Sequence, residues 1–273
     1  GCVCYAFLLE FACYDFPKPS GRFAVVLVVG GGVGISIPGG FWVATEKTVF
    51  AMPETGLGLF PDVGGGWFLP RLPGEVGMYL ALTGARMKAP DLYAVGIASH
   101  VAMADEIPAI IGALVGADIA DCNDVADILA QFHADPEPSP LSTVYDEIDD
   151  HFDLSSVEAI VASLQADQGE WAQKNAALLA RKSAMSLKVT FEQLRRGMAC
   201  ETFRENMEME YRIVNNLMAF PDFHEGVRAI LIDKDNAPVW SPSALGAVTD
   251  ADVEGVFAPL KSGDLFSDTA EEI

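Results

Sequence analysis

Basic residues are scarce in this sequence. Lysine and arginine together number 17 against 39 aspartate and glutamate residues, and the formal net charge is −22 at pH 7. Because a nucleic-acid interface needs a basic face against the phosphates, we expect no nucleic-acid partner. Histidine is sparse too, and its four positions show no ligand spacing: His100, His133, His151 and His224. We therefore expect no metal centre.

Cysteine is also sparse, and no C-x-x-C pair occurs. The five cysteines are scattered along the chain: Cys2, Cys4, Cys13, Cys122 and Cys200. An odd, scattered set is typical of reduced thiols, which predicts a cytoplasmic protein, or a mitochondrial-matrix protein if the source is eukaryotic. The segment 1–16 also lacks the basic start of a secretory signal peptide.

One stretch lacks charge altogether, between Arg22 and Glu46, and its length would suit a membrane-spanning helix. Six glycines and Pro38 lie within it. A strand, a glycine turn and a second strand explain this composition better than a helix does. We therefore expect no membrane association.

Two carboxylates, Glu54 and Asp62, stand out in the glycine-rich stretch Met52–Leu72. Pro53 and Pro61 each precede one of them, and five glycines fill much of the rest: Gly56, Gly58, Gly64, Gly65 and Gly66. This composition predicts a shaped loop, neither helix nor strand. On a rigid apolar loop, desolvation and mutual repulsion can separate the two pKa values, as acid/base chemistry requires. The alternative is a surface loop with two solvated acids.

A second glycine-rich turn, Gly30, Gly31 and Gly32, follows the apolar run Phe23–Val29 directly. A strand that ends in such a turn and opens a helix presents free backbone N–H groups, which can hold a phosphate or an oxyanion. Isoleucine stands where the dinucleotide motif needs its last glycine, and no lysine follows as in a phosphate loop. An oxyanion site is therefore the better interpretation, with a plain tight turn as the alternative.

The proline-rich segment 135–140 is the clearest break in the chain. It separates a predicted α/β region, residues 1–135, from a helical region, residues 141–273. In the first region, hydrophobic patterning predicts a strand over 41–52, a short extended piece over 97–102, and helices over 73–83, 89–95, 106–115 and 125–132. In the second it predicts helices over 142–152, 156–166, 169–180, 186–198, 202–219 and 224–232.

Taken together, these stretches resemble the crotonase (enoyl-CoA hydratase/isomerase) superfamily. The matching text is GGGVGIS at 30–36, VATEKTVFAMPETGLGLFPDVGGGWFLPRLPG at 43–74, YLALTGARMKAPDLYAVGIASH at 79–100, MEYRIVNN at 209–216 and DFHEGVRAILIDKDNAPVW at 222–240. The resemblance implies an α/β, crotonase-like core (a ββα spiral) followed by helices. Hydratases of the superfamily use two glutamates, at the places of Gly34 and Glu54, and this chain keeps only the second. Its hydrolase branch carries an aspartate at the place of Asp62.

The resemblance therefore implies a hydrolase of a short hydroxyacyl-CoA thioester, with 3-hydroxyisobutyryl-CoA, an intermediate of valine breakdown, as substrate. The N–H of Gly31, flanked by Gly30 and Gly32, would stabilise the oxyanion. Glu54 would attack the carbonyl or activate water, and Asp62 would hold the substrate hydroxyl or assist proton transfer. No cofactor is implied, since coenzyme A is part of the substrate. A hydratase or isomerase remains an alternative, as does an inactive scaffold, and the C-terminal helices could form a homo-oligomer.

On so acidic a chain, the stretch 171–200 reverses the local sign of charge. The stretch contains one acidic residue, Glu192, and six basic residues: Lys174, Arg181, Lys182, Lys188, Arg195 and Arg196. This stretch could attract the phosphates of coenzyme A. The alternative is a solvated helix face.

The motif similarity starts near Gly30, where a full crotonase domain would already have contributed several strands. An A-G-G-D-like turn, which would supply the second oxyanion donor, does not occur in residues 1–29. We therefore expect a core that is incomplete at its N-terminus. We expect these 273 residues alone to be poorly stable and to have little or no hydrolase activity.

Overall fold

The computed structural model describes residues 21–24, 27–29 and 40–266. Their contacts divide the chain into two units. One, the helical unit, combines Met52–Ala85 with the chain from Asp146 onward; the other, the sheet unit, combines the described residues up to Ala51 with Arg86–Tyr145. This division differs from the predicted one at residues 135–141, because the glycine-rich stretch packs with the C-terminal helices.

The sheet unit contains two small sheets. In the first, the parallel strands run in the order β1 (Gly21–Ala24), β3 (Phe41–Ala44) and β6 (His100–Val101). In the second, β4 (Val49–Ala51) lies between a parallel β2 (Leu27–Val29) and an antiparallel β5 (Met87–Lys88).

The single strand predicted over 41–52 was wrong, because a turn divides it between the two sheets. The N–H of Thr48 donates to the carbonyl oxygen of Thr45 at 2.9 Å, and the N–H of Thr45 donates to Oγ1 of Thr48 at 2.8 Å. Glu46 and Lys47 lie exposed at the tip. Both threonines are buried, so their side chains supply hydrogen bonds that the strand ladder no longer offers.

Three helices and one 3-10 turn complete the sheet unit: α5 (Ala89–Ala94), α6 (Ile107–Gly116), α7 (Cys122–Ala130) and η3 (Leu141–Val144). They agree with the predicted helices within three residues. A small core holds α6 and α7 to β3, and it consists of Val43, Ala102, Ile107, Ile110, Val125 and Leu129. The proline-rich segment has no regular structure over 135–139, as predicted.

The helical unit begins with the glycine-rich stretch. The prediction that this stretch is a loop without helix was wrong. The stretch forms three short helical turns, η1 (Glu54–Leu57), α3 (Gly65–Phe68) and η2 (Leu69–Arg71). Gly58 and Gly64, with φ of 71° and 92°, bound these turns at left-handed positions that other residues adopt only with strain. Pro53 and Gly58 therefore bound η1, and Gly64 marks the start of α3, a role that the counts of proline and glycine in the sequence do not reveal.

Further helices and helical turns follow, and all of them were predicted except η5 and α14. They are α4 (Val76–Thr83), α8 (Tyr145–Phe152), α9 (Val157–Ala166), α10 (Glu170–Leu179), α11 (Ala184–Ala199), α12 (Phe203–Leu217), α13 (Asp222–Val227), the π-helical turn η4 (Arg228–Ile232), η5 (Leu245–Ala247) and α14 (Asp250–Phe257). None of the described helices is both long and apolar enough to cross a bilayer.

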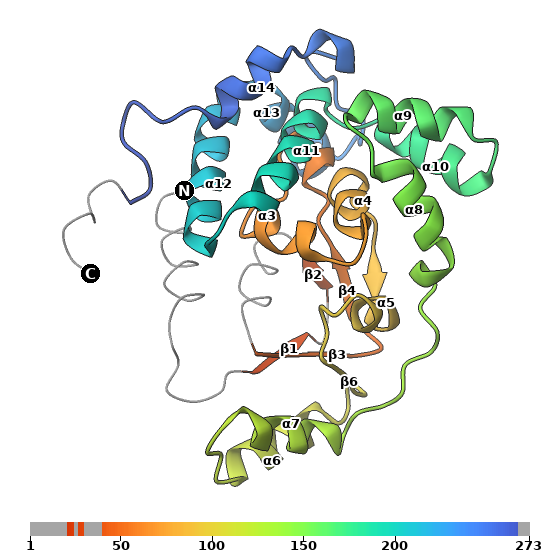
Figure 1. Cartoon of the computed structure of the whole chain (residues 1–273), viewed down its shortest axis with the longest axis vertical. Coiled ribbons are helices and arrows are strands. Elements are labelled where there is room, and N and C mark those ends of the chain that lie inside the picture. The colour runs from red at the N-terminus through yellow and green to blue at the C-terminus, as the bar shows by residue number, and fades with distance from the viewer. Residues whose placement is uncertain (1–20, 25–26, 30–39, 267–273) are drawn as a thin grey trace. The chain divides into compact units, whose positions relative to one another are not determined.

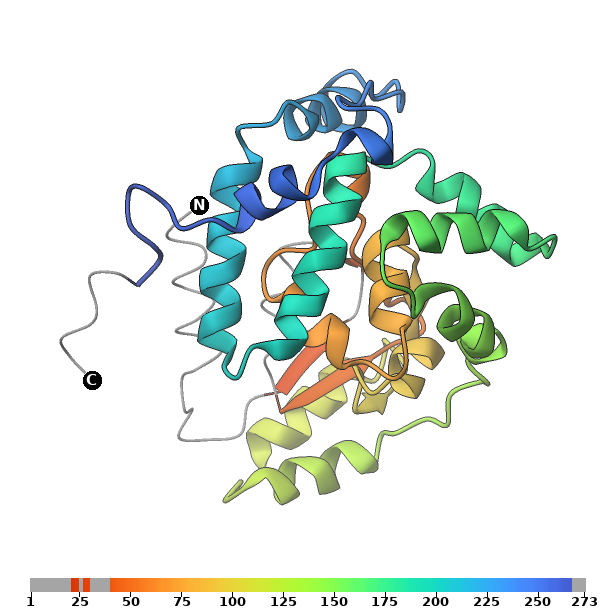
Figure 2. The same ribbon diagram turned by 45° about the horizontal axis from the view of Figure 1, so that its top comes forward.

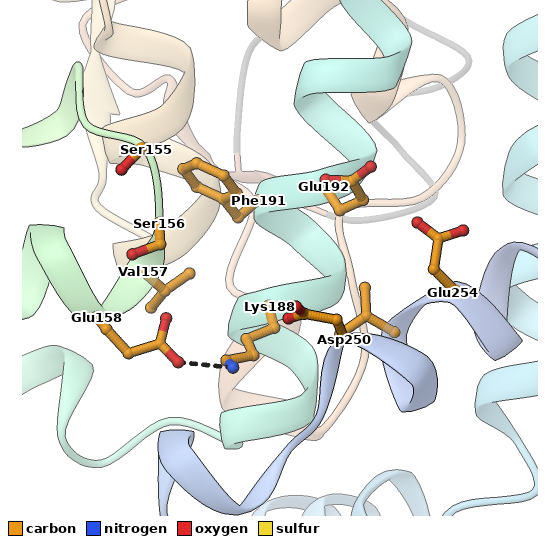
Figure 3. A pocket seen from close by; sticks show the side chains of 10 residues that line it. Ser155, Ser156, Val157, Glu158, Lys188, Phe191, Glu192, Asp250 and Glu254 are labelled. Atoms are coloured by element: carbon orange, nitrogen blue, oxygen red, sulfur yellow. Dashed lines mark ion pairs between the residues drawn. The ribbon is translucent and has the colours of Figure 1, made fainter.

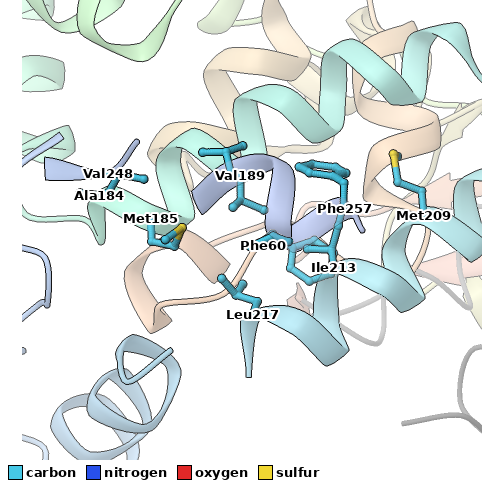
Figure 4. Packing of buried hydrophobic residues seen from close by; sticks show 11 residues of the cluster. Phe60, Ala184, Met185, Val189, Met209, Ile213, Leu217, Val248 and Phe257 are labelled. Carbon is cyan, nitrogen blue, oxygen red and sulfur yellow. The ribbon is translucent and has the colours of Figure 1, made fainter. Parts of the chain in front are cut away.

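The core of the helical unit lies between α11, α12 and α14. Figure 2 shows α14 lying across the other two helices, and Figure 4 shows the buried side chains between them. Phe60 of the glycine-rich stretch is fully buried in this cluster, together with Met185, Val189, Met209, Ile213, Leu217, Val256 and Phe257. The core therefore ties the segment between Glu54 and Asp62 directly to the C-terminal helices.

The short helix α3 packs against α11 (Figure 1) at a point where only glycine fits. A Cβ atom on Gly197 of α11 would lie 1.9 Å from the carbonyl oxygen of Gly66. That approach lets α11 run directly beneath the glycine-rich stretch.

We expect Gly197→Ala to lower the free energy of unfolding by about 3 kcal/mol, because the added methyl group must push α3 and α11 apart. The matched control is Gly112→Ala in α6, where an added Cβ would meet nothing within 4 Å. It should stabilise the protein by up to about 1 kcal/mol through helix propensity alone. Urea unfolding of both variants measures the difference, and equal effects would contradict the close packing.

Candidate active site

Glu54 is the first residue of η1, and its side chain is buried. It is only 4% exposed, and its Oε2 atom has no hydrogen-bond partner among the described residues. Burial raises the pKa of Glu54 to about 8, and the charges of Asp62 and Glu210 add to this effect. A hydrogen bond with its own backbone and the charge of Lys182 act in the opposite direction. The interpretation of Glu54 as a solvated surface acid is therefore wrong.

Asp62 lies between Phe60 and the helix α3, and it is half-buried. Burial raises its pKa to about 6, with a backbone hydrogen bond opposing. The two carboxyl groups therefore titrate in different ranges, as the loop composition predicted, because Glu54 is the more deeply buried. One can hold a proton while the other is ionised.

A third carboxyl group, that of Glu210 in α12, forms hydrogen bonds with the glycine-rich stretch that carries Glu54 and Asp62. Its Oε2 accepts the N–H of Gly64 at 2.9 Å, and its Oε1 accepts the N–H of Gly66 at 2.9 Å. Asn206, one turn earlier on α12, donates to the same Oε1 at 2.9 Å. Gln193 of α11 donates to Oε1 at 3.3 Å and to the carbonyl oxygen of Pro61 at 2.7 Å. Asp62 thus lies in a segment that is held from both sides.

Glu210 is fully buried, and burial raises its pKa to about 7 against the effect of its hydrogen bonds. The sequence pattern assigned Glu210 no role, although this residue lies in the matching text MEYRIVNN. The available signal was its place on α12, four residues after Asn206 and between the apolar Met209 and Ile213. An acid at a core-facing helix position needs donors.

Separate hydrogen bonds hold the turn η1 in place. Oγ1 of Thr55 donates to the carbonyl oxygen of Leu82 at 3.1 Å, and Ser183 N–H donates to that of Thr55 at 3.4 Å. Oγ of Ser183 in turn donates to Oδ2 of the buried Asp222 at 2.5 Å. Helices α4, α11 and α13 therefore share the fixing of the turn that carries Glu54.

The basic stretch 171–200 divides into paired and unpaired groups. Lys188 forms an ion pair with Glu158 at 2.6 Å beside a cavity of about 300 Å³ (Figure 3). Arg196 pairs with Glu192 at 2.6 Å, and Arg195 lies 3.5 Å from Glu75. For these three residues the ion-paired helix face is the better interpretation. Lys182, by contrast, lies beside η1.

Two predictions about the site, the oxyanion turn and the absence of a metal centre, stay predictions. Gly30, Gly31 and Gly32 lie outside the described residues, so their oxyanion role stays a prediction. Within the described ranges, no group of three or more His, Cys, Asp or Glu side chains could hold a metal ion. What the described residues offer is a buried carboxyl group that can accept or give a proton near neutral pH, next to a second carboxyl group with a lower pKa.

We expect Glu210→Gln to lower the free energy of unfolding at pH 8 by about 2 kcal/mol. The amide has one acceptor oxygen in place of two, so the N–H of Gly64 or Gly66 loses its buried partner. Glu208→Gln, on the same helix and in a partly exposed ion pair with Arg204, is the matched control and should change stability by less than about 0.5 kcal/mol. Denaturant unfolding compares the two variants. Equal losses in the free energy of unfolding would show that the hydrogen bonds of Glu210 do not stabilise the stretch.

The model of the enoyl-CoA hydratase/isomerase family matches residues 5–257. The similarity therefore begins well before Gly30, and the expectation that it starts there was wrong. The mitochondrial 3-hydroxyisobutyryl-CoA hydrolases of Xenopus tropicalis and Danio rerio are 43% and 45% identical over 264 residues. Each alignment covers 95% of this chain and 68% or 69% of the relative.

Two solved structures are similar over nearly the whole chain, each with a TM-score of 0.85. A carnitinyl-CoA dehydratase from Mycobacterium thermoresistibile is 34% identical and covers 96% of this chain, which spans 74% of it. An enoyl-CoA hydratase from Rhodobacter sphaeroides is 35% identical and covers 97%, with the same 74%. These likenesses confirm the predicted crotonase-like α/β fold class. The chain belongs to the enoyl-CoA hydratase/isomerase family.

Proposed function

We propose that this chain hydrolyses a short hydroxyacyl-CoA thioester, namely 3-hydroxyisobutyryl-CoA, to 3-hydroxyisobutyrate and coenzyme A. The observation that carries the proposal is Glu54, a buried carboxyl group with one unpartnered oxygen and a pKa raised to about 8. A second carboxyl group, Asp62, lies on the same fastened stretch. Relatives 40–45% identical to this chain carry the name of this hydrolase.

In the proposed reaction, ionised Glu54 either attacks the thioester carbonyl or takes a proton from a water molecule that does so. The carbonyl oxygen becomes an oxyanion, which the N–H of Gly31 stabilises in the turn that Gly30 and Gly32 shape. The C–S bond then breaks, and coenzyme A leaves as a thiolate that takes up a proton. If Glu54 attacks first, water subsequently hydrolyses the acyl-enzyme anhydride. No further cofactor takes part.

Asp62 is the residue that would distinguish a hydroxyacyl group from a plain acyl group. Its carboxylate can accept a hydrogen bond from the substrate hydroxyl or assist the proton transfer to the leaving group. Because Asp62 is half-buried and Glu54 is buried, Asp62 is the more accessible of the two.

Hydration or dehydration of an enoyl-CoA is the second candidate, favoured by the names of the two solved structures. It is disfavoured by Gly34, which stands where hydratases of the family carry a second glutamate. Measuring water addition to crotonyl-CoA alongside thiol release from 3-hydroxyisobutyryl-CoA separates the two reactions. Binding of both compounds without turnover would indicate a scaffold.

The surroundings of the reaction are proposed as follows. The protein acts in the cytoplasm, or in the mitochondrial matrix if its source is a eukaryote. The second location is supported by the relatives, which are named as mitochondrial enzymes. Its partner is the acyl-CoA substrate, and neither nucleic acid nor a membrane is involved. Self-association would use the C-terminal helices. That these residues alone have little or no activity stays a prediction.

We expect Glu54→Gln to reduce thiol release at least a hundredfold while the unfolding transition is retained. The amide has nearly the same shape but can neither attack nor accept a proton at neutral pH. Glu170→Gln, at an exposed position in the first turn of α10, is the matched control and should leave turnover unchanged. Hydrolysis by the Glu54 variant at the unmodified rate would remove this residue from the mechanism.

For Asp62→Asn we expect a loss that depends on the substrate. If Asp62 binds the hydroxyl group, kcat/KM should fall at least tenfold more for 3-hydroxyisobutyryl-CoA than for isobutyryl-CoA, which lacks that group. Thiol release from both compounds, measured with both proteins, gives the comparison. Equal losses on the two substrates would assign Asp62 to proton transfer or to structure.

A further inference from the structure

Lys182 lies in the connection between α10 and α11, residues 180–183, and its side chain runs against η1. A Cβ atom on Gly56 would come within 3.2 Å of Nζ of Lys182, and one on Gly84 within 3.5 Å. The ammonium group therefore lies against the backbone of two glycines, one of them in the same turn as Glu54.

The residues on either side of Lys182 are tied down. The carbonyl oxygen of Arg181 accepts Nε1–H of Trp240 at 2.9 Å. Ser183 bonds to Thr55 and to Asp222, as described above, and Asp222 also accepts the N–H of Ser241 at 2.8 Å. The backbone at Lys182 is thus held on both sides, so the fold fixes the point from which its side chain extends toward η1.

The charged groups that act on Glu54 are two acids, Asp62 and Glu210, and one cation, Lys182. Those that act on Lys182 are Glu54 and Arg181. Across the described part of the chain, Lys182 has no carboxylate within 4.0 Å, unlike Lys188, Arg195 and Arg196. It therefore interacts with Glu54 at a longer range than an ion pair, as a charge next to a carboxyl group that is itself buried.

We propose that Lys182 is a positioning residue for the reaction: its ammonium group favours the ionised form of Glu54 and so sets the pH range in which the enzyme turns over. The proposal rests on the proposed function, in which the carboxylate of Glu54 is the reacting form. Without this cation, only the hydrogen bond with its own backbone would oppose burial and the two like charges, which favour the protonated form of Glu54.

Burial lowers the pKa of Lys182, whereas it raises the pKa of Glu54. The pKa of Lys182 is lowered to about 8, chiefly by burial, and the charge of Glu54 limits the decrease. At pH 7 most of the lysine is therefore protonated, so its charge is present where the reaction needs it. Lys182 also lines a cavity of about 410 Å³ together with Gly56, Arg181 and Trp240, so water reaches its surroundings.

The test compares Lys182→Met with Lys182→Arg and with the control Lys174→Met, which removes an exposed cation from α10. The first readout is a carboxyl ¹³C NMR titration of Glu54, whose signal is assigned by its loss in Glu54→Gln. We expect the pKa of Glu54 to rise by about one unit in Lys182→Met, because an opposite charge has been removed. It should stay within a few tenths of a unit in the two other variants.

The second readout is the pH profile of kcat/KM for 3-hydroxyisobutyryl-CoA. Below the pKa, the rate follows the ionised fraction of Glu54, so a rise of one unit lowers the rate about tenfold. The acid limb of the profile should therefore move upward in Lys182→Met by the same amount as the NMR titration. At high pH, where Glu54 is ionised in both proteins, the rates should converge.

An unchanged NMR titration in Lys182→Met would overturn the proposal. So would a loss of activity that is equal at every pH and accompanied by a lower unfolding midpoint, since that pattern belongs to a structural residue. If Lys182→Met does not fold, Lys182→Gln is titrated in the same way. If the titration shifts as expected while no protein releases thiol, the proposed function fails but the coupling between Lys182 and Glu54 stands.

Discussion

The two hydrogen bonds from the N–H groups of Gly64 and Gly66 to the carboxyl group of Glu210 are the interaction on which the rest of the helical unit depends. They join residues that are more than 140 positions apart in the chain. A glycine-rich segment loses much conformational freedom on folding, so it needs strong partners to hold one shape. A fully buried carboxyl group that faces two backbone donors meets that need, because charge-assisted bonds are stronger than neutral ones.

The same burial that strengthens these bonds shapes the chemistry of the site. For Glu54, Asp62 and Glu210 the largest effect on the pKa is burial, and in each case hydrogen bonds oppose it without reversing it. Asp62, with a pKa raised to about 6, is still largely ionised at pH 7, whereas Glu54, with a pKa raised to about 8, is largely protonated. The ammonium group of Lys182 is the charge that acts against the protonation of Glu54.

Glycine serves this unit mainly by leaving room. At Gly197 a side chain would meet the carbonyl oxygen of Gly66, and at Gly226 it would meet that of Leu57, 2.2 Å away. Helices α11 and α13 can therefore approach the backbone of the glycine-rich stretch closely. From α11, Gln193 reaches the carbonyl oxygen of Pro61, and from the first turn of α13, Asp222 accepts a hydrogen bond from Ser183, whose N–H donates to Thr55.

By itself, the sequence determined the family, most helices and the two candidate acids, since these depend on local pattern and on motif text. Local pattern failed at the turn between Thr45 and Thr48. The residues on both sides have the pattern of one strand, but in the structure they pair with two different sheets. The division into units was likewise decided by tertiary structure, because Met52–Ala85 buries its apolar face against helices far along the chain.

The role of Glu210 and the place of Lys182 were also beyond the sequence. Both follow from which backbone groups approach them in space, and spacing along the chain does not record that approach. The pKa values of Glu54 and Asp62 have the same origin, because burial raises both, and helices α4, α11 and α13 pack against the turn that carries Glu54. Local sequence supplied the carboxyl groups, and tertiary packing supplied the low-dielectric surroundings that fix when each one holds its proton.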